Sequence, residues 1–71
     1  MKKYYRYKDA TDNSWKLNKI YEMDVKSDTA LFENGTICHD FKYYAESYFE
    51  PATEQEYMEQ ENQFNSTLIH N

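Results

Sequence analysis

The pair Cys38-His39 is the first candidate for chemistry, because a thiolate becomes a nucleophile when a base lies within hydrogen-bond reach. Neighbouring residues of a strand point to opposite faces, so His39 is poorly placed to deprotonate Cys38. A zinc site needs three or four ligands, and the other histidine, His70, lies in the tail of the chain. We therefore expect a small buried thiol beside a histidine at the rim, with no metal and no cofactor.

Glu22 and Asp24 are the second candidate, since two carboxylates can perform acid–base chemistry when burial separates their pKa values. On one strand face they lie roughly 7 Å apart. The same face carries Lys16 and Lys26, which favours a solvated polar surface. The chain also has no glycine-rich phosphate loop and no Ser/His/Asp set, so we predict that it is not an enzyme.

Tyrosine and glutamate point to binding instead. Eight tyrosines are more than a small core needs, and exposed tyrosines are typical of protein interfaces. Residues 43–71 contain six glutamates and no lysine or arginine. The predicted partner-binding residues are Tyr43, Tyr44, Glu46, Glu50, Glu54, Glu56, Glu59 and Glu61.

The glutamates near the C-terminus have no cation three or four residues away, so a helix formed there would repel itself. Either this helix packs near basic residues of the same chain, or its surface stays negative for a cationic partner. A basic strip with aromatic neighbours offers nucleic-acid binding as an alternative, although the net charge of −5 opposes it. The residues of that alternative are Lys2, Lys3, Arg6, Lys8 and Lys16.

A length of 71 residues indicates one domain with a small core. The single cysteine excludes an internal disulfide, so the aromatic residues, 18% of the chain, must supply the packing. Self-association is another way to stabilise so small a core, which leaves a homo-oligomeric module as a third possibility. No apolar segment resembles a signal peptide or a membrane span, and we expect a cytoplasmic protein.

The elements follow from apolar alternation and turn residues. The segment Trp15–Val25 alternates between apolar and polar residues except at Ile20, and predicts the central strand. Lys3–Lys8 predicts a first strand, with Tyr5 and Tyr7 on its core face. Asn34-Gly35 between apolar runs predicts a hairpin with a type I′ turn, in which Phe32 faces Ile37.

The C-terminal half is less regular. Lys42–Ser47 fits either a short 3₁₀ turn or the end of a strand, and Tyr48–Glu50 predicts a last short strand before Pro51. Thr53 and Glu56 form a capping box, which predicts a helix over about 53–64. We expect one domain over 1–64 and a flexible tail over 65–71.

Five strands in this order are typical of an SH3-like barrel. The segments Tyr4–Tyr7, Trp15 with Lys19–Met23, the Asn-Gly hairpin, and Tyr48–Tyr57 resemble the small SH3-like β-barrel proteins of bacteriophages and prophages. The resemblance implies a mainly β fold: a five-stranded antiparallel barrel with a C-terminal acidic helix. It also implies a mobile-element origin. Together with the small size, the acidity and the tyrosines, the resemblance favours the hypothesis of a protein that blocks a host or bacterial-defence protein, as anti-CRISPR-like inhibitors do, by steric hindrance or charge mimicry.

Overall fold

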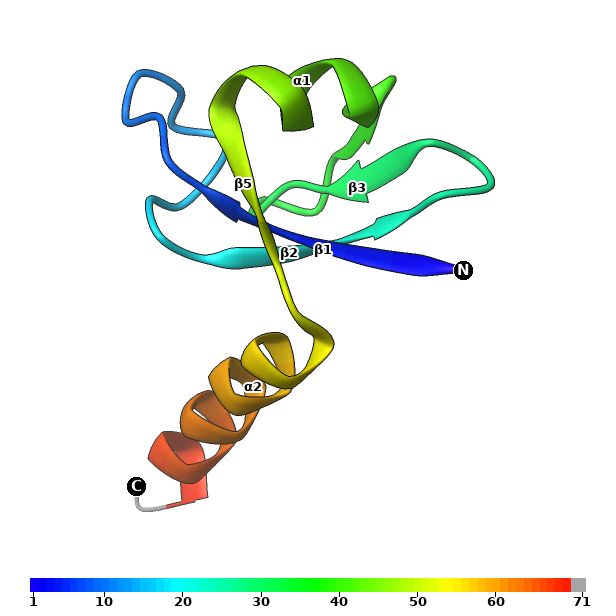
Figure 1. The fold of residues 1–71 in the computed structure, drawn as a ribbon. Helices are drawn as coiled ribbons and strands as arrows, with labels where there is room; N and C mark the ends of the chain where they lie inside the picture. Colours follow the sequence, from blue (N-terminus) through cyan, green and yellow to red (C-terminus); the bar gives the residue numbers. More distant parts are fainter. Residues whose placement is uncertain (70–71) are drawn as a thin grey trace.

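The computed structural model describes the backbone of residues 1–69 and the side chains of residues 1–63. Its strands are all antiparallel and form one open sheet in the order β4-β3-β2-β1-β5, which confirms the prediction of a small, mainly β protein with five strands. Figure 1 shows α1 on one side of this sheet and α2 on the other. In chain order the elements are β1 Lys2–Tyr7, β2 Ile20–Asp24, β3 Thr29–Leu31, β4 Ile37–His39, α1 Phe41–Tyr48, β5 Phe49–Ala52 and α2 Glu54–Ile69.

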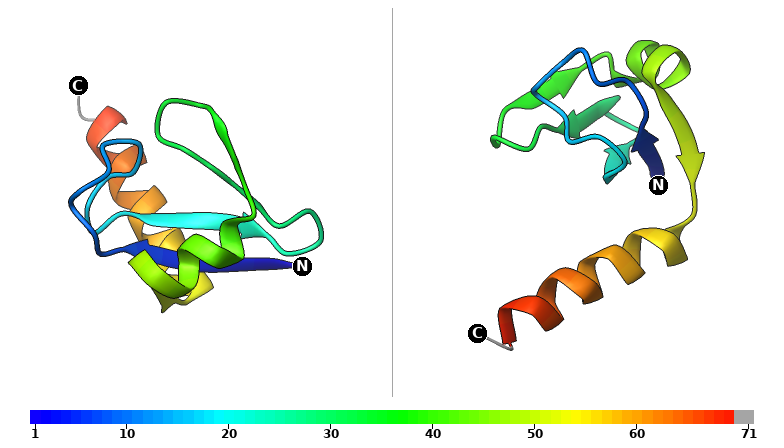
Figure 2. Two further views of the ribbon diagram at one scale, coloured as in Figure 1. Left: turned by 90° about the horizontal axis from the view of Figure 1, so that it is seen from above. Right: turned by 90° about the vertical axis from the view of Figure 1, so that its left-hand side faces the viewer.

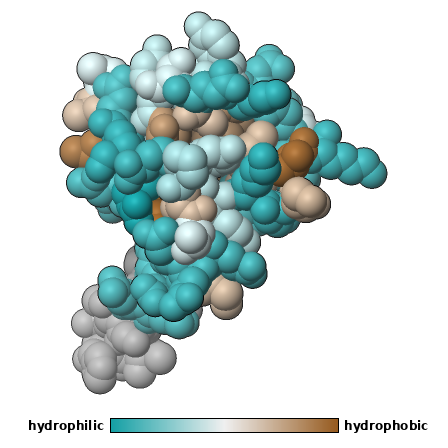
Figure 3. Space-filling view, viewed as in Figure 1, coloured by the Kyte–Doolittle hydropathy of each residue, from teal (hydrophilic) through white to brown (hydrophobic). Residues whose placement is uncertain are grey.

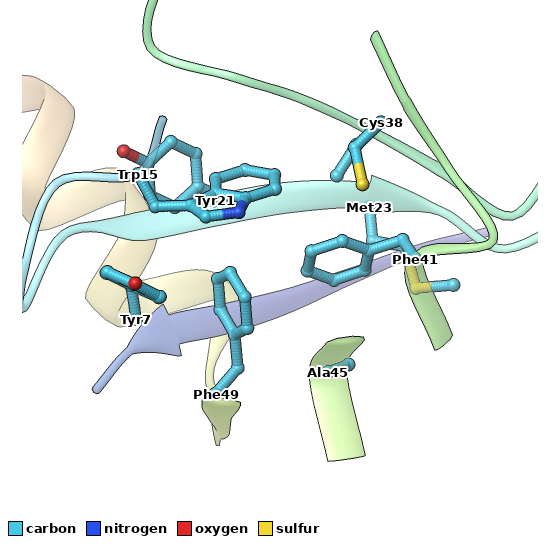
Figure 4. Packing of buried hydrophobic residues seen from close by; sticks show 9 residues of the cluster. Tyr7, Trp15, Tyr21, Met23, Cys38, Phe41, Ala45 and Phe49 are labelled. Atoms are coloured by element: carbon cyan, nitrogen blue, oxygen red, sulfur yellow. The ribbon is translucent and has the colours of Figure 1, made fainter. Parts of the chain in front are cut away.

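The core lies between the sheet and α1 and is built from aromatic rings. Trp15 is at its centre, with ring centroids 4.2 Å from Phe32, 4.7 Å from Tyr21 and 5.1 Å from Phe49. Figure 4 shows Trp15, Tyr21 and Phe49 together with Phe41, converging from the loop, the sheet and α1. Such rings bury a large area each, which is how a short chain without a disulfide holds a core.

The predicted strand over Trp15–Val25 is wrong in its first part, because β2 begins only at Ile20. Asn18 has a φ of 66°, and its N–H donates to the carbonyl of Tyr7 in a turn. This left-handed conformation is incompatible with a strand, and Asn adopts it more readily than most residues. Trp15 therefore belongs to the loop between β1 and β2, from which its side chain enters the core, whereas Leu17 is 49% exposed.

The hairpin has a different register from the predicted one. Leu31, not Phe32, pairs with Ile37. The N–H of Gly35 donates to the carbonyl of Phe32 at 3.0 Å, and Gly35 has a φ of 91° whereas Asn34 has no positive φ. This is a three-residue loop in which a glycine bulge follows an ordinary turn, in place of the two-residue type I′ turn.

Residues 42–47 belong to the α-helix α1, so neither predicted conformation is correct. Phe41 and Ala45 are four residues apart, and both are buried against the core. The helix start is satisfied by Asp28, whose backbone carbonyl accepts from the N–H of Phe41 and whose side chain accepts from that of Lys42. Capping from a distant turn satisfies donors that the local sequence leaves open.

The predicted capping box is present at the start of α2. Glu56 donates its N–H to Thr53 Oγ1 at 3.1 Å, and Thr53 donates its N–H to Glu56 Oε1 at 3.0 Å. The helix then continues to Ile69, beyond the predicted end at residue 64. The last two residues of the predicted tail, 70–71, lie outside the described residues.

The first half of α2 packs on the face of the sheet opposite to the core. The ring centroids of Tyr57 and Tyr4 are 4.9 Å apart. The amide of Gln60 accepts from the N–H of Ile20 at 2.8 Å and donates to its carbonyl at 3.0 Å. Figure 2 shows that α2 then runs away from the sheet towards its C-terminal end.

Candidate protein-binding surface

The two candidates for chemistry lack the geometry of a reactive site. Cys38 is buried, burial raises the pKa of its thiol, and its Sγ lies 3.6 Å from the backbone carbonyl of His39, whose side chain is exposed. Glu22 forms an ion pair with Lys2 at 3.0 Å on the opposite face of the sheet. Among the residues that the structure describes, no group of three or more His, Cys, Asp or Glu side chains could hold a metal ion.

Part of the basic strip is paired with carboxylates of the same chain. Arg6 donates to Glu50 at 3.0 Å and to Glu56 at 2.8 Å, and these bonds raise the pKa of its guanidinium. Lys8 donates to Asn18 at 3.1 Å. The other members of the predicted strip are Lys2, which pairs with Glu22, Lys3, which lines a groove beside Met23, and Lys16, which lies in the loop between β1 and β2.

The predicted glutamates divide into two groups. Glu50 and Glu56 are bound to Arg6, and the hydrogen bond from Arg6 is the main cause that lowers the pKa of Glu56. Packing beside a cation of the same chain therefore accounts for these two residues. The others on α2 are Glu54, which is exposed, Glu59, which accepts from Gln55 at 3.2 Å, and Glu61, which lies beside Tyr57 and contributes to the raised pKa of its hydroxyl after burial.

The tyrosines of α1 remain on the surface. Since Phe41 and Ala45 take the buried side of this short helix, Tyr43, Tyr44 and Tyr48 point outwards and are 69%, 38% and 41% exposed. The ring of Tyr44 contacts both neighbours: its centroid lies 5.4 Å from that of Tyr43 and 6.4 Å from that of Tyr48. We name these three residues, Tyr43, Tyr44 and Tyr48, the α1 tyrosine surface; Glu46 is also exposed on α1 but lines the groove that contains Lys3 and Met23.

Tyr48 was not among the predicted binding residues, because the sequence placed it at the start of a strand. Tyr44 and Tyr48 have the same four-residue spacing as Phe41 and Ala45, and this helical period was the available signal.

A cavity of about 180 Å³ lies beside this surface, between α1 and the loop that joins β1 to β2. Asp9 accepts from the N–H and the hydroxyl of Thr11, and Asp12 accepts from the N–H of Ser14. Tyr7 is the buried tyrosine of the lining; burial raises the pKa of its hydroxyl, the hydrogen bond to the backbone carbonyl of Asp12 opposes this rise, and the charges of Asp9 and Asp12 add to it. The lining residues, which include no cation, are Tyr7, Asp9, Thr11, Asp12, Trp15, Tyr44 and Tyr48.

The predicted partner-binding residues do not form one surface. Tyr43, Tyr44 and Glu46 lie on α1, whereas Glu54 and Glu59 lie on α2, which packs on the other side of the sheet (Figure 1). Over residues 54–63, the part of α2 whose side chains are described, hydrophilic side chains cover most of the face seen in Figure 3. The two helices therefore present separate candidate surfaces, one aromatic and acidic and one mainly acidic.

The chain matches no family model, no curated protein and no solved structure. Within the part of the chain that the structure describes, no helix has the length and apolar character needed to cross a membrane. The class that the fold defines is a small, mainly β domain with two helices, and any function must be argued from its surfaces.

Proposed function

We propose that this protein is a non-enzymatic protein-binding module that contacts a basic region of a partner protein through the α1 tyrosine surface. The observation that carries the proposal is the set of three exposed tyrosines, in which the ring of Tyr44 contacts those of Tyr43 and Tyr48, on a helix whose other side is fixed in the core. Tyrosine supplies a large contact area at low entropic cost and is enriched among the residues that dominate binding energy. The net charge of −5 favours a cationic partner.

We also propose that the fold is a divergent SH3-like barrel of the phage type. The strand order β4-β3-β2-β1-β5, with a helix between β4 and β5, supports this assignment. In this proposal the partner is a host or bacterial-defence protein in the cytoplasm of a bacterium, and binding blocks that protein sterically. The ion pairs of Arg6 and Lys2 disfavour the nucleic-acid alternative, because phosphate binding needs cations that are free to neutralise it.

Affinity capture from bacterial lysates, including strains with active phage defence, tests the proposed surface. The test variant replaces Tyr43, Tyr44 and Tyr48 with alanine, which is a good helix former and leaves the buried side of α1 intact. The matched control removes three exposed apolar side chains elsewhere, by Leu17→Ala, Leu31→Ala and Met58→Ala. Circular dichroism and Trp15 fluorescence verify that each variant is folded.

We expect the tyrosine variant to lose its captured partner, with affinity at least about tenfold lower, and the control to retain it. Reversal of Glu54 and Glu59 to lysine on α2 should leave capture unchanged, since that surface lies across the sheet. Equal capture by the tyrosine variant and the wild type would refute the proposed surface, and failure to capture any protein from any lysate would count against a binding module.

A further inference from the structure

We propose that the cavity between α1 and the β1–β2 loop binds an arginine side chain of the partner; this inference rests on the proposed function and specifies what its surface recognises. The cavity adjoins the α1 tyrosine surface, because Tyr44 and Tyr48 belong to both. Its volume of about 180 Å³ is smaller than the roughly 300–1,000 Å³ of sites for drug-sized ligands, and it therefore suits one side chain.

The aromatic lining favours a planar cation. Four rings line the cavity: those of Tyr44 and Tyr48, which are exposed and have centroids 6.4 Å apart, and those of Trp15 and Tyr7, which are buried. A guanidinium group stacks on aromatic faces and is attracted to them by the cation–π interaction. An ammonium group is more strongly hydrated and lacks the planar face, which makes arginine a better occupant than lysine.

The carboxylates at the cavity supply the charge. Asp9 and Asp12 each use Oδ1 for bonds to their own loop, and no donor from the described residues reaches either Oδ2. Lys8, the nearest cation along the chain, is directed to Asn18 and Glu50 on the opposite face of β1. In the described part of the chain, the carboxylates of Asp9 and Asp12 thus have no cation beside them, and the hydrogen bonds of their turns hold them in place before a ligand binds. Together they can accept several N–H donors of one guanidinium.

The test uses a short capped peptide, Gly-Ser-Arg-Ser-Gly, and two analogues in which citrulline or lysine replaces arginine. Binding is followed by the NMR signals of the Trp15 indole and of the amides of residues 9–14. Citrulline has nearly the shape of arginine but no charge, and lysine has the charge but no planar fork. We expect the arginine peptide to bind at least fivefold more tightly than either analogue.

Two variants locate the binding. Asp9→Asn with Asp12→Asn removes both charges but keeps the oxygen acceptors of the loop, and should weaken arginine binding at least fivefold. The matched control, Glu22→Gln with Asp24→Asn, removes two charges from the opposite face and should leave binding unchanged. Tyr48→Leu keeps bulk on α1 without the aromatic face, and should weaken binding even if the loop variant fails to fold.

The proposal is overturned if the three peptides bind equally, if the arginine peptide gives no shifts at these residues, or if both Asp9→Asn/Asp12→Asn and Tyr48→Leu bind as the wild type does. Each of these outcomes is separate from failure of the proposed function. Capture that depends on the α1 tyrosines but occurs without arginine binding would leave the binding module standing and remove only the occupant of its cavity.

Discussion

The side-chain amide of Gln60 joins α2 to the sheet through two hydrogen bonds. It accepts from the N–H of Ile20 and donates to the carbonyl of the same residue, at 2.8 and 3.0 Å, in a partly buried position. Leucine at position 60 keeps the size and helix propensity of glutamine but offers neither a donor nor an acceptor. Both backbone groups of Ile20 would then lose a partner under the helix.

The cost follows from these two bonds. A hydrogen bond contributes about 0.5–1.5 kcal/mol net, and a buried group left without a partner costs about 1–3 kcal/mol. Because the position is only partly buried, water can reach the freed groups, and we expect Gln60→Leu to lower the free energy of unfolding by about 1–2 kcal/mol. For a domain of this size that loss lowers the melting temperature by about 5–15 °C.

Urea unfolding followed by Trp15 fluorescence and circular dichroism measures this loss, and amide hydrogen exchange at Ile20 reports the docking of α2 directly. Gln55→Leu is the matched control, since Gln55 is exposed and its side-chain amide donates to Glu59 within the helix. If Gln60→Leu is as stable as Gln55→Leu and Ile20 is equally protected from exchange in both, the amide does not fix the helix and this reasoning is wrong.

Three further predictions concern stability. Arg6→Gln removes the ion pairs to Glu50 and Glu56, and should lower the free energy of unfolding in urea by about 1 kcal/mol at low salt. Salt screens ion pairs, so this loss of stability should be smaller at high salt, and an equal loss at both salt concentrations would contradict an ionic origin. Gly35→Ala should lower stability by about 1 kcal/mol in thermal melts and Gly35→Asn by less, because φ is 91° with open space around it; equal losses would implicate packing. Burial raises the pKa of Tyr21 to about 12, above its ordinary value of 10, so the stability that it contributes is complete below pH 10 and lost as the pH rises towards 12. Tyr21→Phe should flatten this alkaline fall in denaturation experiments, and an unchanged fall would assign it to other groups.

Features with a local cause could be predicted from the sequence. The capping box needs only Thr53 and Glu56, three residues apart, and the last strand needs only the residues next to Pro51. The first strand was also predicted nearly to its ends, because alternation places Tyr7 in the core and Arg6 on the other face. In each case the signal and the structure lie within a few residues of one another.

Features that depend on distant contacts could not be predicted in this way. Trp15 and Tyr21 are both buried, but a turn at Asn18 separates them, and apolar spacing alone cannot distinguish this arrangement from a strand. The helix α1 has no side-chain cap of its own. Asp28, in the turn before β3, supplies the acceptors instead. The sequence of these eight residues therefore lacks the local capping signal that would predict a helix.

The difference between strand and helix at α1 decides what the candidate site is. In an extended segment Tyr43 and Tyr44 would point to opposite faces, and one of them would enter the core. In the helix the core side is taken by Phe41 and Ala45, so both tyrosines reach the surface and Tyr48 joins them one turn later. The same helix faces the β1–β2 loop and so brings tyrosine rings next to aspartates that lie more than thirty positions earlier in the sequence. The surface proposed for binding and the cavity beside it thus depend on a helix at α1 and on its contact with the β1–β2 loop, which is why the sequence indicated the tyrosines but not the aspartates.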